Sequence, residues 1–219
     1  MAPDKRRVER MFSNMRLYEA RNVIFSLGQN LVWRRYLIRE VEGKLLDVAT
    51  GEGNVLRLYR RGFKVGVDIA MGMLRRAKGN LLLVRGDAEN LPIRDATFNT
   101  VSIAFGLRNV PDKLAALREF NRVLKPGGKV LILEMKVGDG ILSWLQIPYV
   151  AIVMPLLAPL FGGSVGDYIY LFRSILNFPG PREMEELLVA SGFTLERFYH
   201  FHLGSSYLYV GRKVGEVRT

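Results

Sequence analysis

The sequence predicts an α/β fold in which a doubly wound, mainly parallel sheet ends in an antiparallel hairpin. Two observations lead to this prediction. Between residues 44 and 134, short apolar runs typical of buried strands alternate with helical segments, as in parallel sheets that carry helices on both faces. Near the C-terminus, residues 194–202 and 206–212 are predicted as two strands joined through Gly204.

The segment before the first strand, residues 1–43, is predicted to be helical. Val8, Met11 and Phe12 recur at the spacing of one helical face, and residues 22–38 form a second helical segment. We expect these helices to form a lid over the carboxyl edge of the sheet or to lie beside it.

Three successive predicted strands each lead to an acidic residue. The first reaches Asp47 just before a glycine-rich turn, residues 64–67 are followed by Asp68, and residues 81–85 lead to Asp87. Ligands of open parallel sheets bind outside the carboxyl ends of the strands. The three carboxylates are therefore expected to form one acidic rim around one crevice. The alternative, three unrelated solvated acids, is weakened by their common register.

The turn after the first strand narrows the class of ligand. A dinucleotide-binding fingerprint requires glycine or alanine at the position of Leu56, and no Lys-Ser or Lys-Thr pair follows to hold phosphates. A nucleoside ligand without a pyrophosphate fits better. S-adenosylmethionine is such a ligand, and it offers a ribose diol, an adenine amine, an ammonium and a carboxylate.

The polar groups of S-adenosylmethionine have expected partners along this edge. Asp68 would accept hydrogen bonds from the ribose hydroxyls, and Asp87 from the adenine amine. Gly51 and Gly53 would let the backbone approach the methionine part, and the helix start near Asn54 would favour its carboxylate.

Two further helices and a strand follow. One helix is predicted to begin at Asp112 and to end at residues 125–128, where Lys-Pro-Gly-Gly stops it and turns the chain into a strand over residues 129–134. The other helix, residues 182–191, precedes the hairpin.

Residues 140–166 contain no charged side chain. The segment is long enough to span a bilayer, which takes about 20 apolar residues, but Pro148, Pro155 and Pro159 would interrupt a spanning helix. We interpret it as a broken helical insertion, either a lid over an apolar substrate or a surface that dips into lipid. Packing as ordinary core is the alternative.

Composition excludes several classes of function. The 219 residues favour one domain, and the absence of cysteine excludes disulfides, thiolate metal sites and thiol catalysis. The formal net charge of +11 would attract nucleic acid or anionic lipid, but the basic residues are scattered and no nucleic-acid-binding motif is present. The N-terminus has no signal-peptide pattern, so we expect a cytoplasmic location without nucleic acid as a partner.

Several motifs carry a resemblance to a known family. Residues 103–110 read Ile-Ala-Phe-Gly-Leu-Arg-Asn-Val, residues 122–128 Arg-Val-Leu-Lys-Pro-Gly-Gly, and residues 86–92 Gly-Asp-Ala-Glu-Asn-Leu-Pro. With Tyr18 and Trp33 near the N-terminus, they make the chain similar to UbiE-type C-methyltransferases of menaquinone and ubiquinone biosynthesis. These are class I S-adenosylmethionine-dependent methyltransferases with a Rossmann-like fold.

The resemblance implies the organisation and activity of the chain. One methyltransferase domain would comprise an N-terminal helical lid (1–43), a cofactor-binding core (44–135), an apolar substrate or lid insertion (136–181) and a C-terminal helix and hairpin (182–219). It would methylate a ring carbon of a lipid-tailed quinol, demethylmenaquinol above all. It would use S-adenosylmethionine and no metal, and it would meet the inner face of the membrane peripherally through residues 140–166. A homodimer is left open.

The resemblance also implies the site. Arg108 and Asn109 would fix or polarise the quinol oxygen, and Tyr18 would hydrogen-bond it or face the sulfonium; for Arg108 a structural ion pair is the alternative. Other functions also remain open: methylation of another lipid or small aromatic compound, or cofactor binding without catalysis at a membrane. The residues expected to bind the cofactor are Asp47, Ala49, Thr50, Gly51, Gly53, Asp68, Ile69, Met73, Asp87, Ala88, Ala104 and Phe105.

Overall fold

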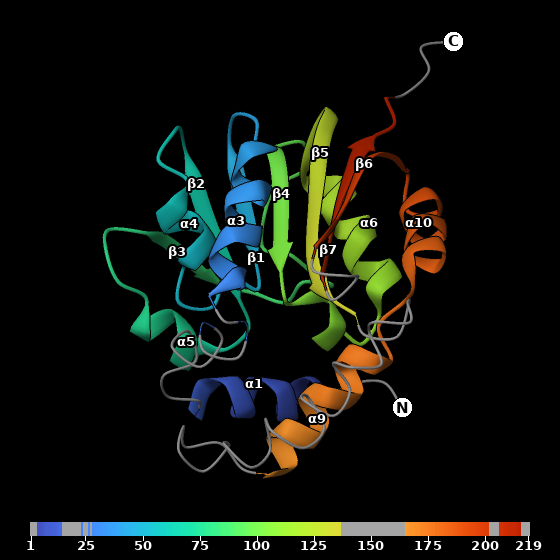
Figure 1. The fold of residues 1–219 in the computed structure, drawn as a ribbon. Helices are drawn as coiled ribbons and strands as arrows, with labels where there is room; N and C mark the ends of the chain where they lie inside the picture. The colour runs from blue at the N-terminus through green and yellow to red at the C-terminus, as the bar shows by residue number, and fades with distance from the viewer. Residues whose placement is uncertain are drawn as a thin grey trace.

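A seven-stranded sheet with the order β3-β2-β1-β4-β5-β7-β6 forms the centre of the computed structural model (Figure 1), which describes residues 4–14, 23, 26, 28–136, 165–201 and 206–215. Neighbouring strands from β3 to β5 are parallel, whereas β7 is antiparallel to both β5 and β6. The predicted parallel sheet with a C-terminal hairpin is therefore confirmed. The strands are β1 (Leu45–Val48), β2 (Lys64–Asp68), β3 (Leu82–Arg85), β4 (Phe98–Ala104), β5 (Leu124–Met135), β6 (Phe193–Phe201) and β7 (Ser206–Lys213).

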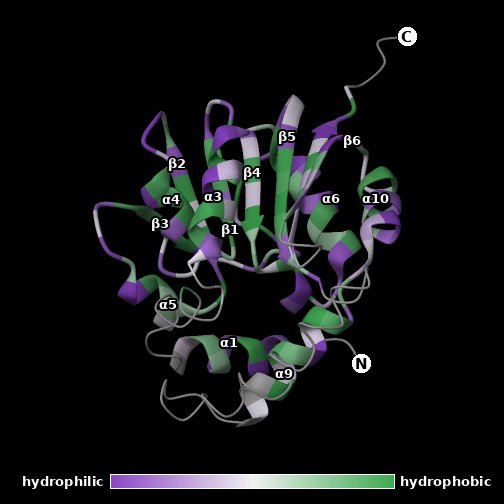
Figure 2. Ribbon diagram, in the orientation of Figure 1, coloured by the Kyte–Doolittle hydropathy of each residue, from purple (hydrophilic) through white to green (hydrophobic). Residues whose placement is uncertain are grey.

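Helices cover both faces of the sheet, because the central strands contribute apolar side chains to a cluster on each face. Figure 2 shows that these strands consist largely of hydrophobic residues. One apolar cluster joins the sheet to α3 and α4, and the other joins it to α6 and α10. The doubly wound arrangement is thus confirmed. The helices are α1 (Lys5–Asn14), α3 (Gln29–Arg39), α4 (Asn54–Leu58), α5 (Met71–Arg76), the 3-10 turn η1 (Leu107–Asn109), α6 (Lys113–Val123), α9 (Val165–Leu176) and α10 (Pro181–Ala190).

Helix α1 lies across the carboxyl ends of the strands, next to α9 (Figure 1). Its C-terminal end is held by Arg76, whose guanidinium donates hydrogen bonds to the carbonyls of Ser13 (2.8 Å) and Phe12 (3.0 Å). A 2.7 Å ion pair between Glu9 and Arg85 adds a second attachment, to the end of β3. The sequence left open whether the N-terminal helices cover this edge or lie beside it; α1 lies across the edge, and α3 packs on a face of the sheet.

The Lys-Pro-Gly-Gly motif, residues 125–128, was predicted to form the turn between a helix and a strand, but in the structure it lies within a strand. Helix α6 ends at Val123, and β5 begins at once, with Leu124 paired to Phe98. The next pair is Lys129 with Thr100, so the motif forms an irregularity inside β5. Gly127 makes this geometry accessible because it adopts a φ of 69°, which glycine tolerates without strain.

Several predicted features lie outside the described residues. They include Tyr18, part of the helical segment 22–38, the turn at Gly204 and residues 140–164 of the apolar segment. Within the part of the chain that the structure describes, none of the helices has the length and apolarity needed to cross a membrane.

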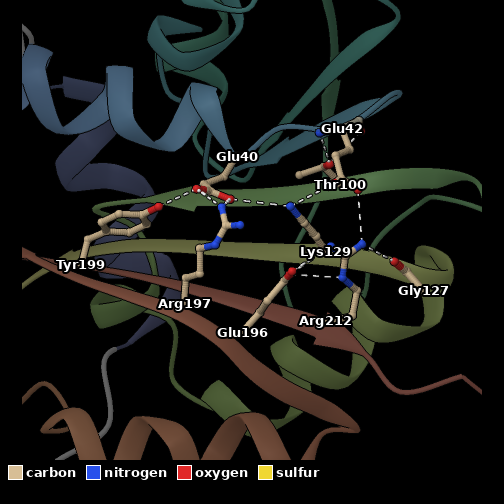
Figure 3. Close-up of polar contacts among 9 residues, drawn as sticks. All are labelled: Glu40, Glu42, Thr100, Gly127, Lys129, Glu196, Arg197, Tyr199 and Arg212. Carbon is tan, nitrogen blue, oxygen red and sulfur yellow. Dashed lines mark hydrogen bonds and ion pairs between the residues drawn. The ribbon is translucent and has the colours of Figure 1, made fainter.

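An ion network ties α3 to the strands at the end of the sheet away from α1 (Figure 3). Glu40, directly after α3, accepts hydrogen bonds from Tyr199 (2.7 Å) and Arg197 (3.0 Å) and lies 3.6 Å from the ammonium of Lys129. Lys129 also pairs with Glu42 at 2.6 Å. The side chains of Glu40 and Lys129 are only 7% and 6% exposed, so each charge depends on its partners.

We expect Glu40→Gln to lower the free energy of unfolding by about 2 kcal/mol at pH 7, because it removes a buried charge from its partners. Burial raises the pKa of Glu40, but the hydrogen bonds from Tyr199 and Arg197 outweigh this effect and hold the pKa below its ordinary value. The ionised carboxylate therefore stabilises the fold above its unfolded pKa, and this contribution disappears as the pH falls through the folded pKa.

Urea unfolding at pH 7 and in the acid range measures the difference in the free energy of unfolding between the wild type and Glu40→Gln. This difference should become smaller in acid. Glu186→Gln is the matched control. Glu186 pairs with Arg182 on α10, where both side chains are exposed, and its loss should cost less than about 0.5 kcal/mol. If Glu40→Gln and Glu186→Gln lowered the free energy of unfolding equally, the buried network would not stabilise the fold more than an exposed ion pair does.

Candidate active site

The loops after β1 and β4 are strained in the same way. Ala49 follows β1 with a φ of 52°, and Phe105 follows β4 with a φ of 59°. Residues other than glycine rarely adopt such values, and where they do they concentrate at functional sites. The two loops also touch: a Cβ on Gly106 would lie 2.6 Å from the Cβ of Ala49. Glycine is required at this position for the loops to pack together.

A cavity opens at these strand ends, with about 970 Å³ of empty space that includes open solvent at its mouth. The loops after β1, β2, β3 and β4 form its walls, and α1 and α3 contribute side chains. Every residue predicted to bind the cofactor lines it except Gly53, and Asn109 lines it as well. Lining residues that the sequence did not single out for this site include Lys5, Val8, Phe12, Arg34, Glu52, Ala70, Gly86, Val110 and Pro111.

The two glycines of the turn have different environments. The backbone N–H of Gly51 donates a 2.8 Å hydrogen bond to Oδ2 of Asp68, and a Cβ here would lie 3.1 Å from the terminal methyl of Met73. Gly53 precedes α4 with a φ of 78°, and a Cβ would lie 2.4 Å from Leu81. Gly51 thus belongs to the cavity wall, whereas Gly53 makes the turn and faces Leu81.

Asp47 is buried at the back of the cavity. Its two oxygens accept hydrogen bonds from the hydroxyls of Ser102 (2.6 Å) and Thr50 (2.7 Å). Burial raises the pKa of Asp47 to about 6, although both hydroxyls oppose the shift. The site therefore holds a carboxylate with a fixed orientation, and a neighbouring positive charge would stabilise its ionised form.

Asp68 is held by backbone groups. Besides the bond from Gly51, its Oδ1 accepts a 2.8 Å hydrogen bond from the N–H of Ala70. Burial raises the pKa of Asp68, and the N–H groups of Ala70 and Gly51 work against this shift. A carboxylate has about four acceptor positions, so Asp68 can still accept hydrogen bonds from a ligand.

Asp87 connects the cavity to α1. Its Oδ2 accepts a 2.7 Å hydrogen bond from the ammonium of Lys5, which also pairs with Glu89. Val8 and Phe12 of the same helix line the cavity. Their helical spacing was visible in the sequence, but it did not reveal that this face of α1 covers the site.

The two predicted catalytic residues of η1 are placed differently. Nη1 of Arg108 lies 2.7 Å from Oε2 of Glu134 and 2.6 Å from the carbonyl of Phe105, and Arg108 is absent from the cavity lining. Oε1 of Glu134 also accepts the backbone N–H of Arg108 at 3.1 Å, so Glu134 caps η1. Asn109 lines the cavity, and its Oδ1 accepts a 3.2 Å hydrogen bond from the hydroxyl of Tyr170.

This arrangement can bind a ligand that offers hydroxyl and amino groups to carboxylates. Val8, Phe12, Met73 and Phe105 supply apolar surface beside the acids, which suits flat rings. Among the described residues, no group of three or more histidine, cysteine, aspartate or glutamate side chains is arranged to hold a metal ion.

Residues 1–213 match the model of the ubiE/COQ5 methyltransferase family. A demethylmenaquinone methyltransferase of Staphylococcus aureus strain JH9 is 37% identical over 227 aligned positions, which cover 96% of this chain and 94% of the relative. The protein of strain Newman matches equally well.

Solved structures with low sequence identity share the fold. A Thermotoga maritima protein described as a SAM-dependent methyltransferase has a TM-score of 0.70 and 19% identity, with 93% of this chain and 98% of the other covered. The cyclase SpnF has a TM-score of 0.68 and 15% identity, with 98% of each chain covered. Since a cyclase shares this fold, the fold alone does not determine the reaction.

We expect the unliganded protein to lose stability relative to Asp47→Asn as the pH rises from about 4 to about 6. Asp47 is ionised in the unfolded chain over this window but protonated in the fold, where its pKa is about 6. The two states differ by about two pKa units, so Asp47→Asn should gain about 3 kcal/mol relative to the wild type across the window.

Urea unfolding without ligand at pH 4, 5, 6 and 7 measures this gain. Asp4→Asn is the control, because Asp4 is exposed and its substitution should change the free energy of unfolding by less than about 0.5 kcal/mol. If the free energy of unfolding had the same pH dependence in the wild type and Asp47→Asn, this would contradict the raised pKa of Asp47.

Proposed function

The chain belongs to the ubiE/COQ5 methyltransferase family, and we propose that it methylates a ring carbon of demethylmenaquinol with S-adenosylmethionine as the methyl donor. The observation that carries the proposal is the acidic cavity at the strand ends, in a chain 37% identical to a demethylmenaquinone methyltransferase. The substrate would be the reduced quinol, because its hydroxyls make the ring electron-rich at carbon.

The cavity fits the polar groups of S-adenosylmethionine. Asp68 has acceptor positions for the ribose hydroxyls, Asp87 lies at the next strand end for the adenine amine, and the fixed carboxylate of Asp47 suits the ammonium. Gly51 lets the backbone come close to the methionine part. When bound, S-adenosylmethionine supplies a methyl group activated by a sulfonium.

Asn109 is the proposed contact to the quinol oxygen. Burial raises the pKa of the Tyr170 hydroxyl, so this group stays protonated and donates to Oδ1 of Asn109. The amide nitrogen of Asn109 is then oriented to donate in turn. A hydrogen bond to the quinol oxygen would stabilise the negative charge that develops when its proton is lost.

Arg108 would act from behind Asn109. Its guanidinium is 4% exposed and is paired with Glu134, so it would be a positioning residue that holds η1 and Asn109 in place without touching the substrate. Tyr18, which lies outside the described residues, would complete the site from the N-terminal lid. The enzyme would thus contribute positioning, charge stabilisation and exclusion of water.

The lipid tail of the quinol requires access from a membrane. We propose that residues 140–166 contact the inner face of the bilayer peripherally, as part of a single domain that also comprises the lid, the core and the C-terminal hairpin. Arg6, Arg7 and Arg10 are exposed on α1 and would favour contact with an anionic surface. A homodimer is compatible with this arrangement and is left as an open proposal.

Transfer of labelled methyl from S-adenosylmethionine to chemically reduced demethylmenaquinol in detergent tests the proposal. We expect product from the wild type, and at least tenfold less from Asp47→Asn at limiting S-adenosylmethionine, because the cofactor ammonium loses its ionic partner. Tight binding of S-adenosylhomocysteine without methylated quinol would reject demethylmenaquinol as the substrate.

We expect Arg108→Met to lower kcat by up to about 10²-fold, the cost of misplacing a substrate-positioning group such as Asn109 by about 1 Å. Affinity for S-adenosylhomocysteine should change less than threefold, because Arg108 does not line the cavity. Steady-state kinetics measures kcat, and calorimetry measures the affinity for S-adenosylhomocysteine.

Two further variants serve as controls for Arg108→Met. Arg108→Met alone leaves the buried carboxylate of Glu134 without its cation. The double variant with Glu134→Gln replaces that carboxylate by a neutral amide. Arg118→Ala removes an exposed arginine of α6 and should leave kcat unchanged. Turnover near the wild-type rate in folded Arg108→Met protein would remove Arg108 from the mechanism.

A further inference from the structure

Helix α3 contributes a charged residue to the cavity. Its buried residues are Asn30, Trp33, Arg34 and Leu37, and Arg34 is only 4% exposed. Arg34 lines the cavity, with its guanidinium 5.5 Å from the centre of the Phe105 ring. The planar fork of an arginine matches a carboxylate in two parallel hydrogen bonds.

Arg34 shares the cavity with a fixed opposite charge. Asp47 is held in place by Ser102 and Thr50, and the positive charge of Arg34 is near enough to oppose the rise in the pKa of Asp47. The structure thus places one buried cation and one buried anion in the same cavity. An amino acid zwitterion, with an ammonium and a carboxylate on one carbon, is complementary to such a pair.

The other charges of the cavity favour a carboxylate over a phosphate. Glu52, Asp68 and Asp87 are acidic lining residues, and Lys5, the lining cation from α1, pairs with Asp87 and Glu89. A doubly charged phosphate would be repelled by these acids, whereas a carboxylate beside its own ammonium adds no net charge.

The N-terminus of α4, which the sequence favoured for the cofactor carboxylate, is the weaker candidate. The helix has five residues, and Gly53 at its start faces Leu81. Its dipole is accordingly small compared with a full guanidinium charge.

We propose that Arg34 binds the carboxylate of the methionine part of S-adenosylmethionine, opposite the ammonium that faces Asp47. This assignment rests on the proposed function and identifies the residue that distinguishes an intact amino acid tail from a truncated one. It also gives α3 a role in ligand binding besides its packing on the sheet.

Two ligands separate this role from a structural one. S-adenosylhomocysteine carries both the ammonium and the carboxylate, whereas S-adenosyl-3-thiopropylamine keeps the ammonium and lacks the carboxylate. Calorimetry at pH 8, where Asp47 is ionised, gives Kd for each ligand with the wild type, Arg34→Met, Arg34→Lys and Arg35→Met. Arg35 is the neighbouring arginine on α3 and is exposed, so it is the matched control.

We expect Arg34→Met to raise the Kd for S-adenosylhomocysteine by at least tenfold, in line with the loss of a charged hydrogen-bonded pair. Affinity for the amine should change less than threefold, which also shows that the variant is folded. Arg34→Lys should recover part of the lost affinity, and Arg35→Met should match the wild type for both ligands.

Three results would overturn the assignment. Equal losses for both ligands in both Arg34 variants would mean that Arg34 is structural. Unchanged binding of S-adenosylhomocysteine by Arg34→Met would place the carboxylate elsewhere while leaving the proposed function intact. Failure of the wild type to bind S-adenosylhomocysteine at all would reject the proposed function together with this inference.

Discussion

The close approach of the loops after β1 and β4 is the constraint on which the site depends. Ala49 and Phe105 accept positive φ values there, and Gly106 has no side chain to keep the loops apart. Asp47 and Asn109 lie within three residues of this contact along the chain, and both line the cavity. Such strain persists only where the surrounding structure holds it, here the buried core of β1, β4 and β5.

Opposite ends of the sheet use charge for different purposes. Away from α1, Glu40 and Lys129 are matched within the protein, so their charges hold α3 against the strands. At the carboxyl edge, Asp47 and Arg34 line the same open cavity. The first arrangement joins two elements of the fold, and the second is the one proposed to bind a ligand; both rely on the strength of charges in a water-poor environment.

Local patterns predicted the parts of the site that belong to single strand ends. Asp68 and Asp87 line the cavity as expected, because a residue that follows a parallel strand has little choice about the edge it reaches. Gly53 shows the limit of this reasoning. Its position in the glycine-rich turn suggested ligand contact, whereas its φ of 78° and the neighbouring Leu81 side chain explain its presence in structural terms.

The sequence by itself determined the class of fold, the acidic edge and the family, because strand periodicity, glycine turns and family motifs are local. Only the tertiary structure decided which N-terminal helix lies across the carboxyl edge and which lies beside the sheet, and which charges meet. Lys5 reaches Asp87 across 82 positions of the chain, and Arg108 reaches Glu134 across 26. No spacing rule predicts such contacts, since they depend on how separate elements pack. Arg34 enters the site for the same reason: α3 buries the face that carries it against the strands.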